Sequence, residues 1–368
     1  MFHSFSVERF RGLRRCDLHG MKRITLLTGK NNVGKSAILE GLFVHSGNYN
    51  PNLAMVTNAI RGLQKFTVDG NPSNQSPWAS LFYQYEDQQS IKFSGLVSFG
   101  DKPSESISVS LSPVRNQVEL SGLGQSLRMQ ALRVSAFGVA KVLKLEFSKG
   151  RKAGRDSHKP QKHYLLIEDS QAMVFPPAPN PEAASRLLST TRESAGNLVS
   201  QFSRFQIENK VHLLIDALQP MEPRLEGLEV VFDGEPLLHG VFSGSGRRLM
   251  PLPLMGDGLN RVMTLILAIG ACPGGVVLVD DVDTGLHYSI MSKVWQSVVR
   301  AAEEFDVQVV GTTHSSECAE AALEAARDLD KSDDFTVIRL ERNGEDVVTF
   351  TYTADELFEA IDANLEVR

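Results

Sequence analysis

The sequence predicts an α/β fold in which a mixed sheet is interrupted by an antiparallel β lobe and a helical arm. Strand and helix patterns alternate at both ends of the chain, up to about residue 64 and again from about 226. Between about 65 and 175 the apolar period shortens to two, as it does in short antiparallel strands. Residues 183–218 space their apolar side chains for one face of a helix.

The bulk composition is that of an ordinary globular chain. The 368 residues are 42% hydrophobic and 22% charged, with a net charge of −6, so any nucleic-acid contact must come from a local patch. The three cysteines form no CxxC pair, which argues against a disulfide framework or a zinc site. The N-terminus is charged within ten residues, and the longest apolar run, 262–272, is too short to cross a bilayer. We therefore expect a cytoplasmic protein without a membrane segment.

A phosphate-binding loop follows the strand predicted at residues 23–28. Residues 23–28 cluster apolar side chains as a strand does, 35–45 read as a helix, and the residues between them complete the pattern GxxxxGK[ST]. Such a loop turns its N–H groups inward and adds the positive end of a helix, which together bind a phosphate. Lys35 would bridge the β- and γ-phosphates, and the Ser36 hydroxyl would ligate Mg²⁺. The residues expected to contact the nucleotide are Gly29, Asn31, Asn32, Val33, Gly34, Lys35, Ser36 and Ala37.

Two further strands end in side chains suited to hydrolysis. Four apolar residues at 276–279 precede Asp280 and Asp281, so a buried parallel strand would bring both acids to the carboxyl edge of the sheet. Asp280 is then the acid on the Mg²⁺ side, and Asp281 orients the attacking water. A second apolar strand ends at His314, which would sense the γ-phosphate and help to hold the water.

The predicted segments divide the chain into four parts. Residues 1–64 form the N-terminal part of the nucleotide-binding head, 65–182 an antiparallel lobe, 183–225 a helical arm, and 226–368 the C-terminal part of the head. Within the last part, helices are expected at 288–304, 317–329 and 354–365, with a hairpin turned at Asn343 and Gly344.

The order of these sites resembles the ABC-type ATPases of the RecF, SMC and OLD (overcoming-lysogenisation-defect) group. The matching pieces are FRGLRRCDLHGMKRITLLTGKNNVGKSAILEGLF near the start, then MGDGLNRVMTLILAI, VVLVDDVDTGLHYS and VVGTTHSSEC. They cover roughly residues 1–45 and 225–345. The resemblance is closest to compact bacterial ATPases that lack a Toprim nuclease domain after the head.

The resemblance implies a head dimer that sandwiches two ATP molecules with Mg²⁺. Each nucleotide would lie between the phosphate loop of one subunit and the signature helix of the other, which here begins near Gly256, Asp257 and Gly258. Arg261 matches the arginine of that helix, and Asp283 matches an intersubunit contact of the dimer-facing loop. Related split systems pair such an ATPase with a separately encoded nuclease or toxin, commonly in phage defence, and others serve DNA repair.

Two positions depart from the family pattern. The signature usually offers a serine hydroxyl where this chain has Gly256, and the general base is usually glutamate where this chain has Asp281. Because a misplacement of about 1 Å can cost a hundredfold in rate, we expect slow hydrolysis. A regulatory binding module that closes on ATP with little turnover is therefore the main alternative.

Two other classes of nucleotide-binding protein share such a phosphate loop, and one basic stretch of the sequence could bind DNA. A GTPase would share the loop but carry an NKxD motif, which the stretch from Asn209 to His212 lacks. An ABC transporter subunit would place its acids much nearer to the loop. The basic stretch from Lys149 to Lys162 could lie along DNA phosphates or be a solvated hairpin loop, and both interpretations stay open. Assemblies beyond a dimer also stay open.

Overall fold

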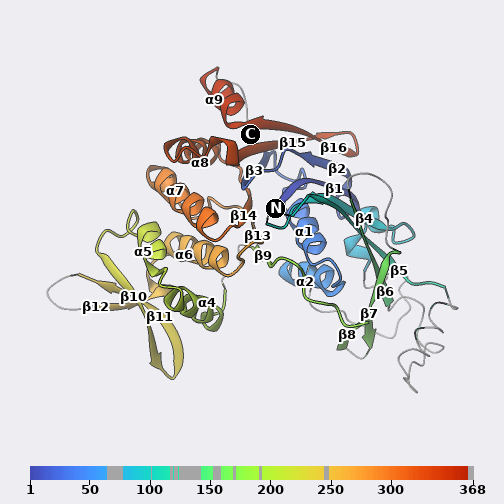
Figure 1. The fold of residues 1–368 in the computed structure, drawn as a ribbon, viewed down its shortest axis with the longest axis horizontal. Helices are drawn as coiled ribbons and strands as arrows, with labels where there is room; N and C mark the ends of the chain where they lie inside the picture. The colour runs from blue at the N-terminus through green and yellow to red at the C-terminus, as the bar shows by residue number, and fades with distance from the viewer. Residues whose placement is uncertain are drawn as a thin grey trace.

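The computed structural model describes residues 1–63, 78–100, 102–116, 119, 123, 142–151, 159–168, 171–189, 193–243 and 248–363. Within them, a mixed sheet of thirteen strands runs in the order β8-β7-β6-β5-β4-β1-β2-β16-β15-β3-β14-β13-β9 (Figure 1). Its strands are β1 Phe2–Phe10, β2 Leu13–His19, β3 Ile24–Gly29, β4 Ile91–Val97, β5 Glu105–Pro113, β6 Val142–Arg151, β7 Gln161–Glu168, β8 Gln171–Phe175, β9 Ser185–Leu188, β13 Val276–Val279, β14 Gln308–Thr312, β15 Phe335–Asn343 and β16 Asp346–Thr353. The predicted α/β class with a mixed sheet is confirmed.

The centre of the sheet is parallel, and this arrangement positions the site. Strands β15, β3, β14, β13 and β9 pair in parallel in that order. Leu27 of β3 lies opposite Thr312 of β14, and Val279 of β13 lies opposite Gly311. The carboxyl ends of three strands that are distant in sequence therefore meet at one edge, where ligands bind in open α/β sheets.

The central strands are buried on both faces. On one face, Leu26, Val277 and Val279 join a core covered by helices. On the other, Leu27 and Leu278 pack into a second core around the helix that follows the phosphate loop. Continuous apolar runs, rather than alternating ones, are what such doubly covered parallel strands require.

The helices lie on both sides of the sheet (Figure 1). They are α1 Lys35–Ser46, α2 Asn52–Ile60, α4 Ala195–Ile207, α5 Val211–Leu218, α6 Asp257–Gly270, α7 Tyr288–Glu304, α8 Ser316–Asp328 and α9 Ala354–Asp362. Among the described helices, none combines the length and the apolar character that a bilayer span needs.

Helix α1 is buried nearly all round. The antiparallel strands of the sheet curve around it (Figure 1), so polar side chains of α1 are enclosed as well. Glu40 pairs with Arg11, and the ring of His45 bonds through Nε2 to the carbonyl oxygen of Ile107 at 3.1 Å. Each buried polar side chain therefore has a partner from outside the helix.

The arm region also differs in part from the prediction. Ser185–Leu188, expected to be helical, is strand β9 at the edge of the main sheet, paired with β13. Four residues are too few for an apolar period to separate strand from helix. Helices α4 and α5 follow, and a separate sheet packs on them, made of β10 Leu225–Asp233, β11 Glu235–Phe242 and β12 Arg248–Pro251. The proposed domain boundaries stay a prediction.

Candidate nucleotide-binding site

The loop between β3 and α1 has a backbone that two glycines make possible. Gly29 has φ +129°, and a Cβ there would lie 2.4 Å from the carbonyl oxygen of Leu340. Gly34 has φ +114°, and its Cβ would lie 2.5 Å from a methyl group of Leu13. Any other residue at either position would be strained and would clash. The loop thus has the strand–turn–helix form that the motif requires.

The remaining predicted loop residues occupy the turn and the first turn of α1. Asn32 takes the left-handed region at φ +64°, Asn31 is exposed, and Val33 and Ala37 are buried. Val33 and Ala37 thereby anchor the loop in the core beside α1.

The Lys35 ammonium folds back onto the loop that precedes it. Its Nζ donates to the carbonyl oxygens of Gly29 at 2.5 Å and Lys30 at 3.1 Å, and it lies 3.1 Å from Nδ1 of His314. Burial lowers the pKa of Lys35 to about 8, against the opposing effect of two nearby carboxylates. A charged donor therefore lies where the loop would receive a phosphate.

Ser36 and Asp280 come together from different ends of the chain. Ser36 Oγ donates to Asp280 Oδ1 at 3.0 Å, and Thr312 Oγ1 donates to the same oxygen at 2.7 Å. Two neighbouring ligands of an octahedral Mg²⁺, each at about 2.1 Å from the ion, would lie roughly 2.9 Å apart. The spacing between Ser36 Oγ and Asp280 Oδ1 therefore fits that ion. The described residues contain no cluster of three or more His, Cys, Asp or Glu side chains that could hold a metal. Mg²⁺ does not need one, because it keeps water and phosphate ligands.

Asp281 and His314 face each other across the same edge of the sheet. Asp281 Oδ1 lies 3.8 Å from His314 Nε2, and the two side chains are 40% and 43% exposed. Burial raises the pKa of Asp281, and the neighbouring Asp280 raises it further. His314 thus lies between Lys35 and Asp281, at hydrogen-bonding distance from the first only.

The helix that the resemblance identifies as the signature helix is α6. Its N-cap is Gly256, at φ +91°, which supplies no side-chain cap, and Asp257 lies in its first turn. A Cβ on Gly258 would lie 2.3 Å from the carbonyl oxygen of Gly285, so the start of α6 packs directly on the loop that follows Asp283.

Arg261 and Asp283 make contacts within their own chain. The Arg261 guanidinium donates to the carbonyl oxygens of Ser189, at 2.6 Å, and of Asp280. Asp283 accepts a hydrogen bond of 2.7 Å from Thr313 Oγ1. The resemblance implied that Arg261 belongs to the signature helix and that Asp283 makes an intersubunit contact, and the structure adds these internal contacts.

Thr312 and Thr313 are the site residues that sequence reasoning missed. Thr312 bonds to Asp280 and accepts the N–H of Asp281 at 2.8 Å, and Thr313 holds Asp283. The available signal was two polar residues directly after a buried strand, one step before His314. Such positions lie at the ligand-binding edge of a parallel sheet.

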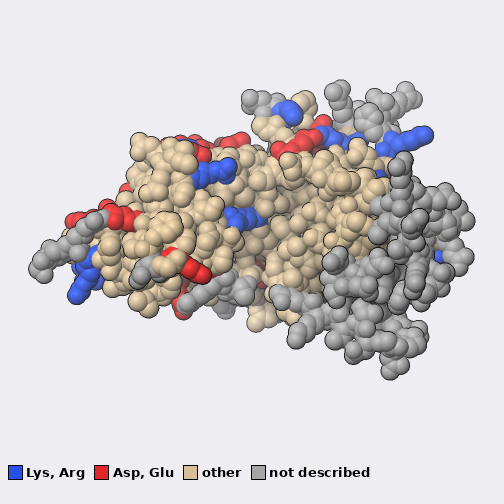
Figure 2. Space-filling model, turned by 90° about the horizontal axis from the view of Figure 1, so that it is seen from below, with Lys and Arg blue, Asp and Glu red and all other residues tan. Residues whose placement is uncertain are grey.

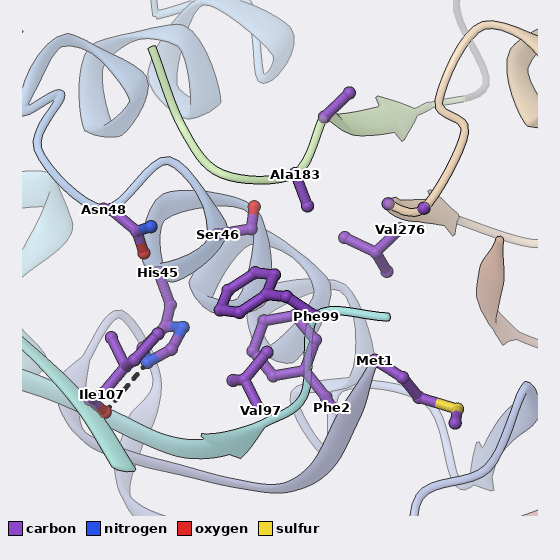
Figure 3. A pocket seen from close by; sticks show the side chains of 13 residues that line it. Met1, Phe2, His45, Ser46, Asn48, Val97, Phe99, Ile107, Ala183 and Val276 are labelled. Carbon is purple, nitrogen blue, oxygen red and sulfur yellow. Dashed lines mark hydrogen bonds between the residues drawn. The ribbon is translucent and has the colours of Figure 1, made fainter. Parts of the chain in front are cut away.

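Two hollows lie near these elements. One of about 270 Å³ separates the arm from α6 and is lined by Leu198, Leu238, Asn260, Arg261 and Thr264 among others. The second, of about 20 Å³, lies beside His45 at the opposite end of β13 from the acids (Figure 3). The second hollow therefore belongs to the packing around α1 and not to the phosphate loop.

Part of the charge in the described part of the basic stretch is paired or buried, while Lys159 is exposed. Lys149 pairs with Glu105 and Glu182, Lys162 lies 3.5 Å from Glu146, and His163 is buried. Residues 152–158 lie outside the described residues. On the face in Figure 2, the described Lys and Arg side chains are scattered and not gathered into one patch.

Comparison with known proteins finds a matching family model and a curated relative. The model described as "AAA domain, putative AbiEii toxin, Type IV TA system" matches residues 238–318. An "ATP/GTP phosphatase" from Helicobacter pylori (strain ATCC 700392 / 26695) is 19% identical over 386 residues, which cover 97% of each chain.

Solved structures with similar chains include three SMC heads. An SmcHead bound to the C-winged helix domain of ScpA has a TM-score of 0.49 at 9% identity, over 97% of this chain and 99% of that one. An Smc head with an extended coiled coil, bound to a ScpA domain derived from Pyrococcus furiosus, scores 0.47 at 7% identity, over 99% of both chains. The SMC head from Thermotoga maritima scores 0.40 at 11% identity, over 95% and 98%. At these scores the fold assignment rests on the strand order and loop geometry described above. The strand order and the loop after β3 have the form of a phosphate-binding α/β fold, and the AAA-domain match and the full-length relative support an ATPase.

Proposed function

We propose that this chain binds Mg·ATP between two copies of itself and hydrolyses it slowly to control a partner. The observation that carries the proposal is the convergence of Lys35, Ser36, Asp280, Asp281 and His314 at the carboxyl edge of one sheet. Phosphoryl transfer needs this combination of a cation, a metal site and a water-orienting group, with little covalent chemistry from the protein.

Each side chain has a part in the reaction. Lys35 turns from the loop carbonyls to the β- and γ-phosphates, and Ser36 and Asp280 would hold Mg²⁺. The ion, when bound, neutralises charge on the phosphate oxygens. Asp281 accepts a hydrogen bond from the attacking water and orients it in line with the bond that breaks. His314, released from Lys35, donates to the γ-phosphate.

The second half of the site would come from the partner subunit. The start of α6 presents backbone N–H groups and the positive end of a 14-residue helix, with a glycine and no capping side chain before it. Aimed at the γ-phosphate of the other copy, these groups would make dimer closure depend on a triphosphate. Higher assemblies could then form from such dimers.

Control of a separately encoded effector is the role that we infer for this dimer. The family model matched by residues 238–318 is described with a toxin and a type IV toxin–antitoxin system. This description supports a nuclease or toxin as the partner, in phage defence or DNA repair. Co-purification without any partner, combined with unchanged phage growth when the gene is deleted, would count against this role.

Turnover with and without Mg²⁺, and with and without DNA, tests the proposal. Lys35→Ala should lower kcat/KM at least roughly a hundredfold, as the loss of one transition-state donor does in other enzymes. Lys30→Ala is the matched control, because its side chain is exposed in the same loop and should change the rate less than about threefold. Absence of Mg²⁺-dependent turnover under every condition would refute the enzymatic part.

A regulatory binding module is the second candidate. Asp281 is one methylene shorter than the glutamate usual in this group, and Gly256 offers no hydroxyl. Both features weaken hydrolysis more than they weaken binding. ATP-dependent dimerisation with negligible turnover, even with DNA, would favour this candidate.

A further inference from the structure

The peptide group that joins Asp280 to Asp281 is held from both sides. Its carbonyl oxygen accepts a hydrogen bond from Arg261 Nη2, and its N–H donates to Thr312 Oγ1 at 2.8 Å. Arg261 reaches it from α6, and Thr312 reaches it from the end of β14. The same guanidinium is anchored to the Ser189 carbonyl at 2.6 Å. Rotation of this peptide would break both bonds at once.

Directly after this peptide, Asp281 adopts a left-handed backbone conformation, with φ +48°. This region is uncommon for residues with a Cβ, although Asp enters it more readily than most. A residue stays in such a region only when its surroundings over-determine it. Because φ sets the direction of the Cα–Cβ bond, this conformation also sets where the Asp281 carboxylate lies, 3.8 Å from His314.

We propose that Arg261 is a positioning residue: it holds the Asp280–Asp281 peptide so that the Asp281 carboxylate points to the attacking water. The proposal rests on the function proposed above, in which Asp281 orients that water. It gives Arg261 a role inside its own subunit, in place of contact with the partner's nucleotide.

Because Arg261 lies on α6, its hydrogen bond to the Asp280 carbonyl oxygen connects the side of the sheet that faces the arm with Asp280 and Asp281. Asn260, Arg261 and Thr264 of α6 border the hollow of about 270 Å³, and Leu198 of α4 in the arm and Leu238 of β11 line it too. This hollow is partly open to solvent, so no side chain fills the space between them there. This face of α6 therefore has room to shift against the arm, and a shift would carry the guanidinium away from the peptide. A partner that moves the arm would then change how Asp281 is oriented.

Kinetics of Arg261→Ala and Arg261→Lys test the inference. We expect Arg261→Ala to lower kcat roughly tenfold to a hundredfold, as misplacement of a catalytic group by about 1 Å does. The Kd for ATP should stay within about threefold, because Lys35 and Ser36 are untouched. Arg261→Lys should fall between wild type and Arg261→Ala, since one ammonium cannot bridge both carbonyls in the fork geometry of arginine.

Chemical rescue separates positioning from general damage. Millimolar guanidinium should restore part of kcat to Arg261→Ala, because the free cation can occupy the vacated place between the two carbonyls. Arg204→Ala is the control: Arg204 also donates to a main-chain carbonyl, that of Ala271 at 3.3 Å, but lies on α4. We expect neither a loss of kcat nor a rescue there. Should Arg261→Ala fail to fold, the intermediate kcat of Arg261→Lys carries the test.

A crystal structure of the Arg261 variant gives an outcome that does not depend on turnover. The inference predicts that φ of Asp281 returns to a negative value when the guanidinium is gone. It is overturned if Asp281 keeps its left-handed conformation, if kcat stays within twofold of wild type, or if only the Kd for ATP rises. An inactive wild type with the predicted change in φ would instead contradict the proposed function and leave the positioning role standing.

Discussion

Glu40 on α1 lies between two arginines, and replacing it with glutamine should destabilise the N-terminal core. One carboxylate oxygen accepts Arg11 Nε, and the other accepts Arg61 Nε at 2.6 Å. Arg11 also donates to Thr57 Oγ1 at 3.0 Å and to the carbonyl oxygen of Ser80 at 3.3 Å. Through Arg11, the carboxylate connects α1 to the turn between β1 and β2, and through Arg61 it connects α1 to the end of α2.

Burial decides the magnitude of this effect. The side chains of Glu40 and Arg11 are 6% and 8% exposed, whereas that of Arg61 is 41% exposed. Arg61 can regain water, but Arg11 would remain as a buried cation without a counter-charge. Removing one partner of such a pair costs about 3–5 kcal/mol. Glutamine keeps the volume and one acceptor, so we expect a loss of about 3 kcal/mol in the free energy of unfolding.

Urea denaturation followed by tryptophan fluorescence measures this loss. Glu345→Gln is the matched control: Glu345 pairs with Arg14 at 3.0 Å, but the two side chains are 56% and 45% exposed. We expect a change of less than about 1 kcal/mol there. The double variant Arg11→Met/Glu40→Met should lose less than Glu40→Gln, because no buried charge is left unpaired. A loss in the free energy of unfolding below about 1 kcal/mol for Glu40→Gln would refute the reasoning. So would a double variant that loses as much stability as the two single substitutions added together.

Three further predictions concern the site and its surroundings. Gly258→Ala drives a Cβ into the carbonyl oxygen of Gly285 and should lower ATP turnover at least about tenfold. Gly196→Ala, which has open space around its Cβ, should leave turnover unchanged. Equal turnover in the two variants would contradict the close packing at Gly258. Burial lowers the pKa of His45 to about 4, so the folded state excludes a proton that the unfolded chain binds below about pH 6.5, and stability should fall by up to roughly 3 kcal/mol as the pH drops from 6.5 to 4. In the same pH titration, the free energy of unfolding of His45→Gln should fall by about that much less than that of wild type. If the two curves of stability against pH ran parallel, the His45 ring would be excluded as the cause. Asp281→Glu restores the usual side-chain length and should raise kcat, by up to about tenfold, with KM within threefold; a fall in kcat would show that the shorter acid is already placed for the water.

The phosphate loop and the acid strand could be predicted because their patterns are local. A glycine-rich loop between a strand and a helix, and four apolar residues before two acids, define their own conformation. The parallel order of β3, β14 and β13 then brings Ser36 and Asp280 together without further information. This part of the site follows from general rules of α/β sheets.

The contacts that tune the site depend on tertiary packing and were not predictable. The resemblance placed Arg261 on the signature helix, but it did not indicate that its guanidinium reaches two carbonyl oxygens just after β9 and β13. Strand β9 exists because β13 pairs with it, since four residues carry too little periodicity of their own. Lys149 reads as part of a basic loop, but Glu105 and Glu182 neutralise it from other segments. In each case the deciding partner lies far away in sequence.

The mass of the chain in solution, measured by light scattering with and without Mg·ATP, tests most directly whether two copies share the nucleotide. Asp281→Ala is the variant to use, because it should keep ATP binding while blocking hydrolysis. The account predicts one chain per particle without ATP and two with it, and no change when Lys35→Ala is added. A particle of one chain at ATP concentrations that saturate the site would contradict the shared nucleotide.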